Sequence, residues 1–414
     1  MAIAAVPGYL GQDFTHASPG MRFGMYLSLW GVDSRTGSPL WTTHDLNFRM
    51  AGQQKETREF KDENKSAALS KALKLGASDL ELMRALQARI AAQASHFVDQ
   101  GRLLNLEARC ISPFTTGLGN EHPLENGFAF LNPYGLPYLA GSGIKGVLRN
   151  AARELCDDWG DAKGWTADRI TALFGRSGAD ADDDFQRGAL SFWDVIPQLA
   201  GDSLQVEIMT PHSNHYLQKG EAPHDSGQPN PINFLTVPPG SGFSFHIECD
   251  EIFLAALAPE LAEGQLWRPL IEAALEHAFD WLGFGAKTAV GYGAMAVDEE
   301  RMRAFERLRE DQEQKRREQA REVARVAEKA AMSPADRAMA DLFDQRTDKN
   351  QDERAVLFAA LKSGKLVEHK VAAARRLKSL MQQASLWRET STKKNPDKDY
   401  PYQDTLMVIK WLES

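Results

Sequence analysis

Cysteine and long apolar runs are the clearest shortages in this chain. Its 414 residues include three cysteines, Cys110, Cys156 and Cys249, which form no CxxC pair and are odd in number, so no disulfide framework is expected. This cysteine usage predicts a reducing, cytoplasmic environment. No apolar run approaches the roughly 18 residues that a membrane helix needs. Residues 1–14 lack the basic and apolar regions of a secretory signal, so we expect neither a leader nor a membrane partner.

Positive charge is also in deficit. The 48 Lys and Arg residues are outnumbered by 57 Asp and Glu residues, and the net charge of −9 argues against general, nonspecific binding to nucleic acid. A local basic groove is compatible with this charge, because the Debye length is only about 8 Å in physiological salt. With 43% hydrophobic and 25% charged residues, the composition is that of a soluble protein with a core, and the length predicts two or more domains.

Established catalytic and metal-binding patterns are missing as well. Histidines gather between residues 210 and 225, where His212, His215, His224 and Asp225 suggest a metal or acid–base site, but their spacing matches no zinc pattern and no cysteine accompanies them. We therefore expect no metal and no cofactor. The alternative is a loop that lies over RNA or another subunit and stacks rings on bases. The residues of this segment that we expect to face RNA are His212, Asn214 and Tyr216.

Hydrophobic periodicity predicts an α+β core. The order is strand, helix, strands, helix, strand, which is the βαββαβ order of a ferredoxin-like (RRM-like) fold with long insertions, a scaffold often used to bind RNA. The last two strands before the second helix, 232–237 and 243–249, are expected to pair as a hairpin. The expected strands are 103–110, 189–196, 204–209, 232–237, 243–249 and 294–297, and the expected helices are 144–159 and 266–282.

Composition divides the chain into four regions. An N-terminal region, 1–102, contains a helical segment at 67–98 that Gly76 is expected to split. The ferredoxin-like core covers 103–298. A densely charged stretch, 299–334, predicts a long solvated helix that ends at Pro334. Residues 335–414 predict a small helical extension, which includes a basic stretch at 362–378.

The most informative motif is GFGAKTAVGYG at residues 283–293. Glycine allows positive φ angles and close approach to a ligand, and a lysine adds a point charge, so the pattern suits a phosphate or a phosphate chain. It is neither a P-loop nor a dinucleotide-binding turn. The alternative is a tight helix-to-strand connection. The residues that we expect to bind are Gly283, Gly285, Lys287, Thr288, Gly291, Tyr292 and Gly293.

Two further segments are candidates for contact with an anionic ligand. GSGIKGVLR, at 141–149, opens a helix whose free amides attract anions, and Ser142 is a candidate cap. Lys145 and Arg149 are four residues apart and share one face of that helix. The segment 117–126 offers Asn120 and His122 as hydrogen-bonding groups. The alternatives are an exposed cationic face and plain turn chemistry.

Taken together, these motifs resemble the RAMP superfamily. GLGNEHPLENGFAF followed by GSGIKGVLRNAARE is similar to its opening motif, although Ala140 and Gly143 replace a usual proline and serine. TPHSNHYL and WLGFGAKTAVGYG are similar to the branch found as the sixth Cmr subunit of type III-B CRISPR effector complexes. The resemblance covers roughly residues 103–298 and says nothing about the chain after residue 300.

The resemblance implies a non-catalytic backbone subunit near the 3′ end of a guide RNA. Its partners would be the guide (CRISPR) RNA, target RNA and other RAMP subunits, in antiviral defence. It also implies that the glycine-rich loop and the start of the first core helix, with Lys145 and Arg149, face the RNA. The alternative function is a RAMP endoribonuclease that processes guide RNA or cleaves target RNA, with a histidine of the 212–224 loop as general base.

Overall fold

The computed structural model describes most of the chain, in two compact units, Met1–Glu306 and Arg307–Ser414. The described residues are 3–32, 39–41, 67–124, 126–157, 164–176, 186–211, 214–222, 224, 231–346 and 351–413. No helix among these residues combines the length and the apolar character that crossing a membrane requires.

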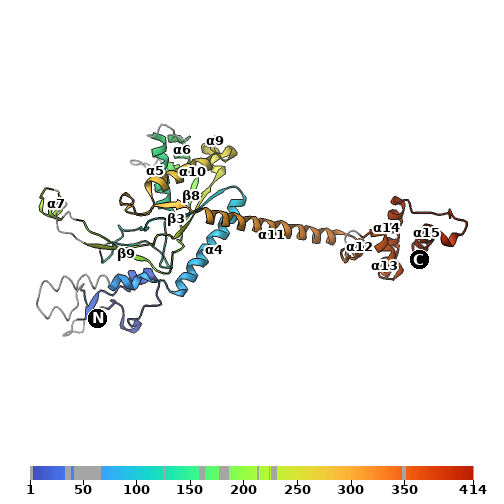
Figure 1. Ribbon diagram of the computed structural model, residues 1–414, viewed down its shortest axis with the longest axis horizontal. Helices are drawn as coiled ribbons and strands as arrows, with labels where there is room; N and C mark the ends of the chain where they lie inside the picture. The colour runs from blue at the N-terminus through green and yellow to red at the C-terminus, as the bar shows by residue number, and fades with distance from the viewer. Residues whose placement is uncertain are drawn as a thin grey trace. The chain divides into compact units, whose positions relative to one another are not determined.

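A four-stranded antiparallel sheet forms the centre of the first unit (Figure 1). Its strand order is β12-β3-β11-β8, which is the ferredoxin-like order when the strands are counted along the chain. Met295 pairs with Cys110, and Gly242 pairs with Arg109, so three strands meet at one edge of the sheet. The α+β prediction is confirmed, and the strand at 103–110 is found with the predicted bounds. The strands are β3 (Leu103–Cys110), β8 (Leu190–Phe192), β11 (Gly242–Cys249) and β12 (Met295–Val297).

Two helices cover the apolar face of the sheet. They are α5 (Gly141–Asp157) and α10 (Trp267–His277), which continues into the π turn η4 (Ala278–Leu282). Both pack on the sheet because their apolar residues recur at helical spacing. Phe243, Phe245 and Ile247 of β11 are fully buried under them. His277 of α10 bonds to Glu154 of α5 through Nε2 and Oε2 at 2.7 Å.

The opposite face of the sheet is polar and covered. Glu107 of β3 is 5% exposed and accepts hydrogen bonds from Ser244 Oγ at 2.7 Å and from Arg301 Nη2 at 2.8 Å. Arg301 lies in the first turns of α11 (Glu299–Ala331), and α4 (Ala77–Asp99) packs on β3 beside it. Burial lowers the pKa of the neighbouring His246 to about 4, so its ring is neutral at pH 7. RRM domains stack RNA bases on this face, and here it is covered.

The expected hairpin between 232–237 and 243–249 is wrong. β10 (Ile232–Thr236) pairs with β9 (Gln205–Met209) in a separate two-stranded ribbon, whereas β11 pairs with β3 along seven residue pairs. The bridge between Phe114 and Val237 draws the end of β10 toward the segment after β3. The ribbon leads to α7 (Asn214–Lys219) at its far end (Figure 1). The sequence predicted these strands correctly, but their pairing was decided by contacts distant in sequence.

Gly76 divides the predicted helix at 67–98 into two. Residues 67–73 are helical, and α4 begins at Ala77, where the Asp79 carboxylate accepts a hydrogen bond from the Gly76 amide at 2.9 Å.

The remaining elements of the first unit are short. They are η1 (Gly8–Leu10), α1 (Pro19–Phe23), β1 (Trp30–Val32), β2 (Pro39–Trp41), β4 (Phe130–Leu131), β5 (Leu136–Pro137), α6 (Ala167–Phe174), β6 (Gly175–Arg176), β7 (Gln186–Arg187), α8 (Glu251–Leu257), α9 (Pro259–Ala262), η3 (Glu263–Gln265) and η5 (Thr288–Val290).

The second unit is helical, which confirms the predicted helical extension. Leu357, Ala373, Leu377 and Val408 are fully buried in a core of its own. Ser333 caps α12 because its hydroxyl accepts a hydrogen bond from the Asp336 amide. After the charged helix α11, the elements are α12 (Pro334–Asp344), α13 (Glu353–Lys362), η6 (Val367–His369), α14 (Lys370–Gln383), η7 (Pro396–Lys398) and α15 (Tyr400–Leu412).

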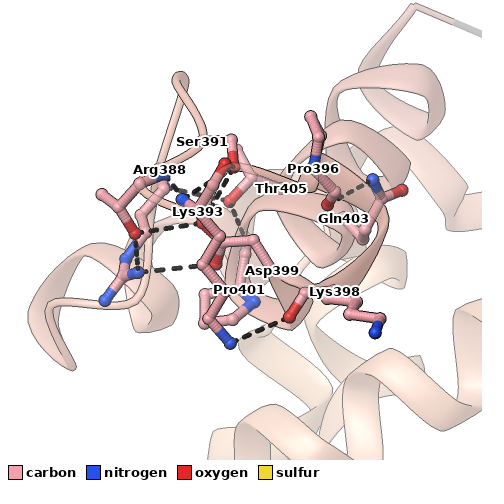
Figure 2. A network of polar contacts seen from close by, with 10 residues as sticks. Arg388, Ser391, Lys393, Pro396, Lys398, Asp399, Pro401, Gln403 and Thr405 are labelled. Atoms are coloured by element: carbon pink, nitrogen blue, oxygen red, sulfur yellow. Dashed lines mark hydrogen bonds and ion pairs between the residues drawn. The ribbon is translucent and has the colours of Figure 1, made fainter.

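A buried carboxylate organises the loop between α14 and α15 (Figure 2). The Asp399 side chain is inaccessible to solvent, and its Oδ2 accepts hydrogen bonds from the Thr392 amide at 2.9 Å, Thr392 Oγ1 at 3.1 Å and Ser391 Oγ at 3.2 Å. Arg388 Nη1 lies 3.5 Å from Oδ1. The Thr392 amide is the main reason that the pKa of Asp399 lies below its usual value.

The bond between Glu107 and Arg301 gives a first prediction. Arg301→Ala leaves a buried carboxylate without its cation and should destabilise the first unit by about 3 kcal/mol, the low end of the range for breaking a buried pair, since Arg301 is partly exposed. Arg303→Ala is the matched control, because its pair with Glu299 is exposed on both sides and such pairs contribute roughly 1 kcal/mol or less. Urea denaturation measures both variants. Equal losses would contradict the anchoring role of Arg301.

The lowered pKa of Asp399 gives a second prediction. Its ionised form stabilises the second unit above the unfolded pKa of about 3.9, and this contribution is lost as the pH falls through the lower folded value. Asp399→Asn should therefore reduce the stability of this unit at pH 7 and weaken its dependence on pH in acid. Asp397→Asn, an exposed carboxylate of the same loop, is the control. Unfolding followed by circular dichroism at pH 7 and in acid decides; an unchanged pH profile for Asp399→Asn would contradict the prediction.

Candidate nucleic-acid interface

One edge of the sheet brings together three of the predicted segments. Since Met295 pairs with Cys110, the glycine-rich loop before β12 and the long segment after β3 leave the sheet at the same edge. The start of α5 is linked to this edge through the segment that follows β8. Leu139 pairs with Val195 through two backbone bonds of 2.8 Å, and the Gly141 amide donates to Asp194 Oδ1 at 2.7 Å. Residues 193–198 then run beside β11 toward Gly242. We call residues 113–117, 141–149 and 283–293 the loop edge.

The glycine-rich loop is built by close backbone contacts. Gly283, Gly285, Gly291 and Gly293 all have positive φ angles, between 69° and 92°. The Ala286 amide donates to the Thr115 carbonyl at 2.8 Å, and the Gly293 amide donates to the Pro113 carbonyl at 2.9 Å. A Cβ atom on Gly285 or Gly293 would collide with the carbonyl of Thr115 or Phe284, whereas Gly291 has open space around it. A tight helix-to-strand connection therefore explains why residues 285 and 293 are glycines. Close packing does not explain Gly291, which is exposed.

Lys287 is held against the β9–β10 ribbon. It adopts a left-handed conformation at φ 61°, and its Nζ lies 5.4 Å from the centroid of the Phe234 ring and 2.8 Å from Met209 Sδ. A cation over an aromatic face keeps its charge while losing part of its hydration. Thr288, the next residue, is half-buried and opens η5. The lysine thus marks the junction of the loop with the ribbon.

Tyr292 fastens the other side of the loop to the same ribbon. Its ring meets Phe234 edge-on with 5.5 Å between the centroids, and its hydroxyl donates to Glu207 Oε2 at 3.4 Å. Burial, followed by the charge of Glu207, raises the pKa of Tyr292, so the phenol stays protonated at neutral pH. Neither Phe234 nor Glu207 stands out in the sequence, because only tertiary packing brings them to the loop.

The start of α5 differs from the expectation at its cap. The helix begins at Gly141, so Ser142 lies inside the first turn, and the carboxylate of Asp194 takes the first free amide. Asp194 is 53 residues away in sequence, which hid this cap. Ser142 is exposed, and Lys145 and Arg149 are half-buried. Burial, with a smaller effect of Arg153, lowers the pKa of Arg149, which remains a cation in the physiological range.

The segment 117–126 divides into an exposed and a buried part. Asn120 is exposed, and its backbone amide donates to the Gly117 carbonyl at 3.0 Å. The His122 ring stacks on Phe23 with centroids 3.8 Å apart, its Nδ1 accepts from the Leu124 amide, and its Nε2 therefore donates to the Phe23 carbonyl at 2.8 Å. Burial lowers the pKa of His122. His122 thus holds α1 in place, and both of its ring nitrogens are occupied within the protein.

The histidine segment is reached through the ribbon and lies away from the loop edge in sequence and topology. His212 and Asp225 lie outside the described residues, and Asn214 begins α7. Tyr216 is 50% exposed. The rings of His215 and His224 stack with centroids 3.8 Å apart, and His215 Nε2 accepts from the His224 amide at 3.2 Å. Within the described part of the chain, no three His, Cys, Asp or Glu side chains gather as metal ligands.

Comparison with known proteins covers the same region. The RAMP superfamily profile matches residues 107–296, which run from β3 through β12. These residues are therefore similar to the RAMP superfamily. The chain is 30% identical to the CRISPR system Cmr subunit Cmr6 of Pyrococcus furiosus, and the match covers 44% of this chain and 65% of the relative. The chain thus spans slightly less than two thirds of the length of that relative.

Solved structures from CRISPR complexes are also similar to the chain. A type III-B Cmr-beta complex bound to cognate target RNA contains a chain with 18% identity and a TM-score of 0.42, matched over 60% of this chain and 76% of its own length. Cmr6 from Pyrococcus furiosus has 25% identity and a TM-score of 0.28, over 47% of this chain and 97% of its own length. The match to the superfamily profile ends at residue 296, so neither α11 nor the helical second unit lies in the region that it covers.

The close contacts of the glycine-rich loop give a third prediction. Gly291→Ala introduces a side chain at positive φ in open space and should cost about 1–2 kcal/mol. Gly293→Ala adds a collision with the Phe284 carbonyl, so it should cost more and speed hydrogen exchange at the Phe284 and Ala286 amides. Urea denaturation and hydrogen exchange by mass spectrometry measure these effects. Equal losses from both variants would show that the carbonyl contact does not constrain the loop.

Proposed function

We propose that this chain is a non-catalytic backbone subunit of a type III-B CRISPR effector complex and binds guide RNA near its 3′ end. The loop edge is the observation that carries the proposal. It joins the glycine-rich loop, the start of α5 with Lys145, and residues 113–117 at one end of a RAMP sheet. Similarity to Cmr6 supports the choice of subunit.

Phosphate contact explains how a chain with net charge −9 serves an RNA complex. In RNA-guided systems, base pairing between guide and target reads the sequence, and the protein holds the backbone. A single subunit then needs only a few phosphate contacts, from exposed amides, from Ser142 and from the cations Lys145, Arg149 and Lys287. The target RNA reaches this subunit through its pairing with the guide. The exposed residues of the loop edge that we assign to the guide RNA are Ser142, Gly285 and Gly291.

The position of the interface also follows from what the sheet has covered. Stacking on the open face of the sheet, as in an RRM, is blocked here by α4 and by the first turns of α11. Guide RNA must therefore lie along an edge, where backbone amides and cations are accessible. His122 supports this edge from within, because it holds α1 through Phe23, while Asn120 lies at the exposed turn.

Neighbouring RAMP subunits are the protein partners in this proposal. The β9–β10 ribbon carries α7 away from the sheet, with Ile208, Tyr216 and Leu217 exposed on it (Figure 1). Exposed apolar residues on a projecting element suit a contact with another chain or with unstacked bases. Catalysis has no part in the proposal. His215, which could serve as a base, already accepts a hydrogen bond from the His224 amide.

Removal of the two lysines tests the proposal. Lys145→Ala with Lys287→Ala should lower RNA retention roughly tenfold or more, since a hydrogen bond to a charged group contributes about 1.5–3 kcal/mol. Arg309→Ala with Lys315→Ala, which removes two exposed cations of α11, is the matched control. The measurement is the amount of guide RNA that co-purifies with the tagged subunit from cells that express the whole complex.

The outcomes separate the function from its alternative. Normal RNA occupancy in the double variant, with the subunit assembled, would contradict the assignment of the loop edge. The same preparations are incubated with labelled guide and target RNA. Metal-independent cleavage that disappears in His215→Ala would replace the proposal by the endoribonuclease function, with the histidine as general base.

A further inference from the structure

The charge of the second unit is unevenly distributed. Between Lys362 and Lys398 the sequence has ten Lys and Arg residues and three Asp and Glu residues, a net charge of +7 in a chain whose total is −9. This stretch contains α14 and the loop before α15. It lies outside the region that the RAMP profile matches, so the function proposed for the loop edge does not account for it.

The loop at 388–400 presents cations on a fixed backbone. The buried Asp399 carboxylate ties Ser391 and Thr392 together, and Lys393 Nζ donates to the Lys398 carbonyl at 2.9 Å. The Lys398 side chain points away from this network (Figure 2), and Lys394 and Lys398 are exposed. A loop that is already ordered loses little conformational entropy when it binds a ligand.

An exposed aromatic ring stands next to these cations. Tyr400 opens α15 immediately after Asp399, and it is 74% exposed. Lys398 lies two residues before the ring, in the loop that the Asp399 carboxylate orders, and Lys394 lies four residues before Lys398. The ring and the two lysines therefore belong to one short, ordered segment.

From this arrangement we infer that the second unit contains its own site for single-stranded RNA, formed by Lys394, Lys398 and Tyr400. Proteins that bind single strands without sequence preference combine cations along the phosphate backbone with aromatic rings on which bases stack. The exposed ring favours RNA over an acidic protein, because a tyrosine beside lysines offers a base a flat partner while the lysines hold the adjacent phosphates. This site goes beyond the loop edge and belongs to the second unit alone.

The test uses the full chain and a fluorescent single-stranded oligouridine of roughly 15 nucleotides, which spans the usual site size. Lys394→Ala with Lys398→Ala should weaken binding and reduce the slope of log K against log salt by about 1.4, the value for two phosphate contacts on a single strand. Tyr400→Leu should weaken binding about tenfold, the size of one stacked base. Lys315→Ala with Arg309→Ala on α11, and Tyr9→Leu, are the exposed matched controls.

A second readout locates the RNA independently of affinity. Ultraviolet cross-linking followed by mass spectrometry should place the oligouridine on the peptide that contains Tyr400, and this cross-link should be lost in Tyr400→Leu. Unchanged affinity, unchanged salt slope and no cross-link in residues 388–404 would overturn the inference. Unchanged RNA binding with loss of another subunit from the assembled complex would also overturn it, since the surface would then bind protein.

The two RNA sites can fail separately. If only the loop edge binds RNA, Lys145→Ala with Lys287→Ala abolishes binding, and the variants of the second unit behave as wild type. If the loop edge does not bind RNA, the Lys145 and Lys287 variant keeps both the wild-type affinity and the cross-link to Tyr400. Loss of affinity in both sets, each with its own cross-linked peptide, is the expected result.

Discussion

At two glycines of the glycine-rich loop, the backbone lies so close to a neighbouring carbonyl that there is no room for a Cβ atom. Gly285 faces the Thr115 carbonyl and Gly293 faces the Phe284 carbonyl, both at positive φ. This contact joins the two segments that leave the sheet where Cys110 pairs with Met295. It brings the loop and, through Lys287 and Tyr292, the β9–β10 ribbon to one edge, so the candidate interface depends on it.

A second constraint decides where RNA has access. The polar face of the sheet is closed by the buried Glu107, which binds Ser244 and Arg301, and by α4. Burying a carboxylate is costly unless its partners are in place, so the first turns of α11 are held to the sheet. The same anchor that closes the face also fixes the point at which the chain leaves the four-stranded sheet. The packing of α4 and of the first turns of α11 therefore covers the polar face of the sheet, and this is why we place the RNA interface at the loop edge.

The second unit uses a buried carboxylate in another way. Asp399 fixes a loop instead of a helix, and the result is a set of lysines and one tyrosine whose backbone is ordered before any ligand arrives. The acidic total charge of the chain conceals this local excess of cations. Electrostatic contacts act over about 8 Å in physiological salt, so the local arrangement of charge is more important for binding than its sum.

The sequence by itself determined the ferredoxin-like order, the strand at 103–110, the break at Gly76 and the helical extension, because periodicity, glycine and charge density act locally. It also marked the glycine-rich loop, since several close glycines around a lysine are informative without any fold. Only the tertiary structure decided that Asp194 caps α5, that His122 holds α1 and that β10 pairs with β9. It also decided that the Lys287 ammonium lies over the Phe234 ring. Each of these contacts joins residues that are distant in sequence or, for β10, selects β9 as the pairing partner in place of β11. The chain adopts the set of contacts that together bury the most apolar area and leave the fewest polar groups unpaired. No local sequence pattern shows which of the competing sets that is.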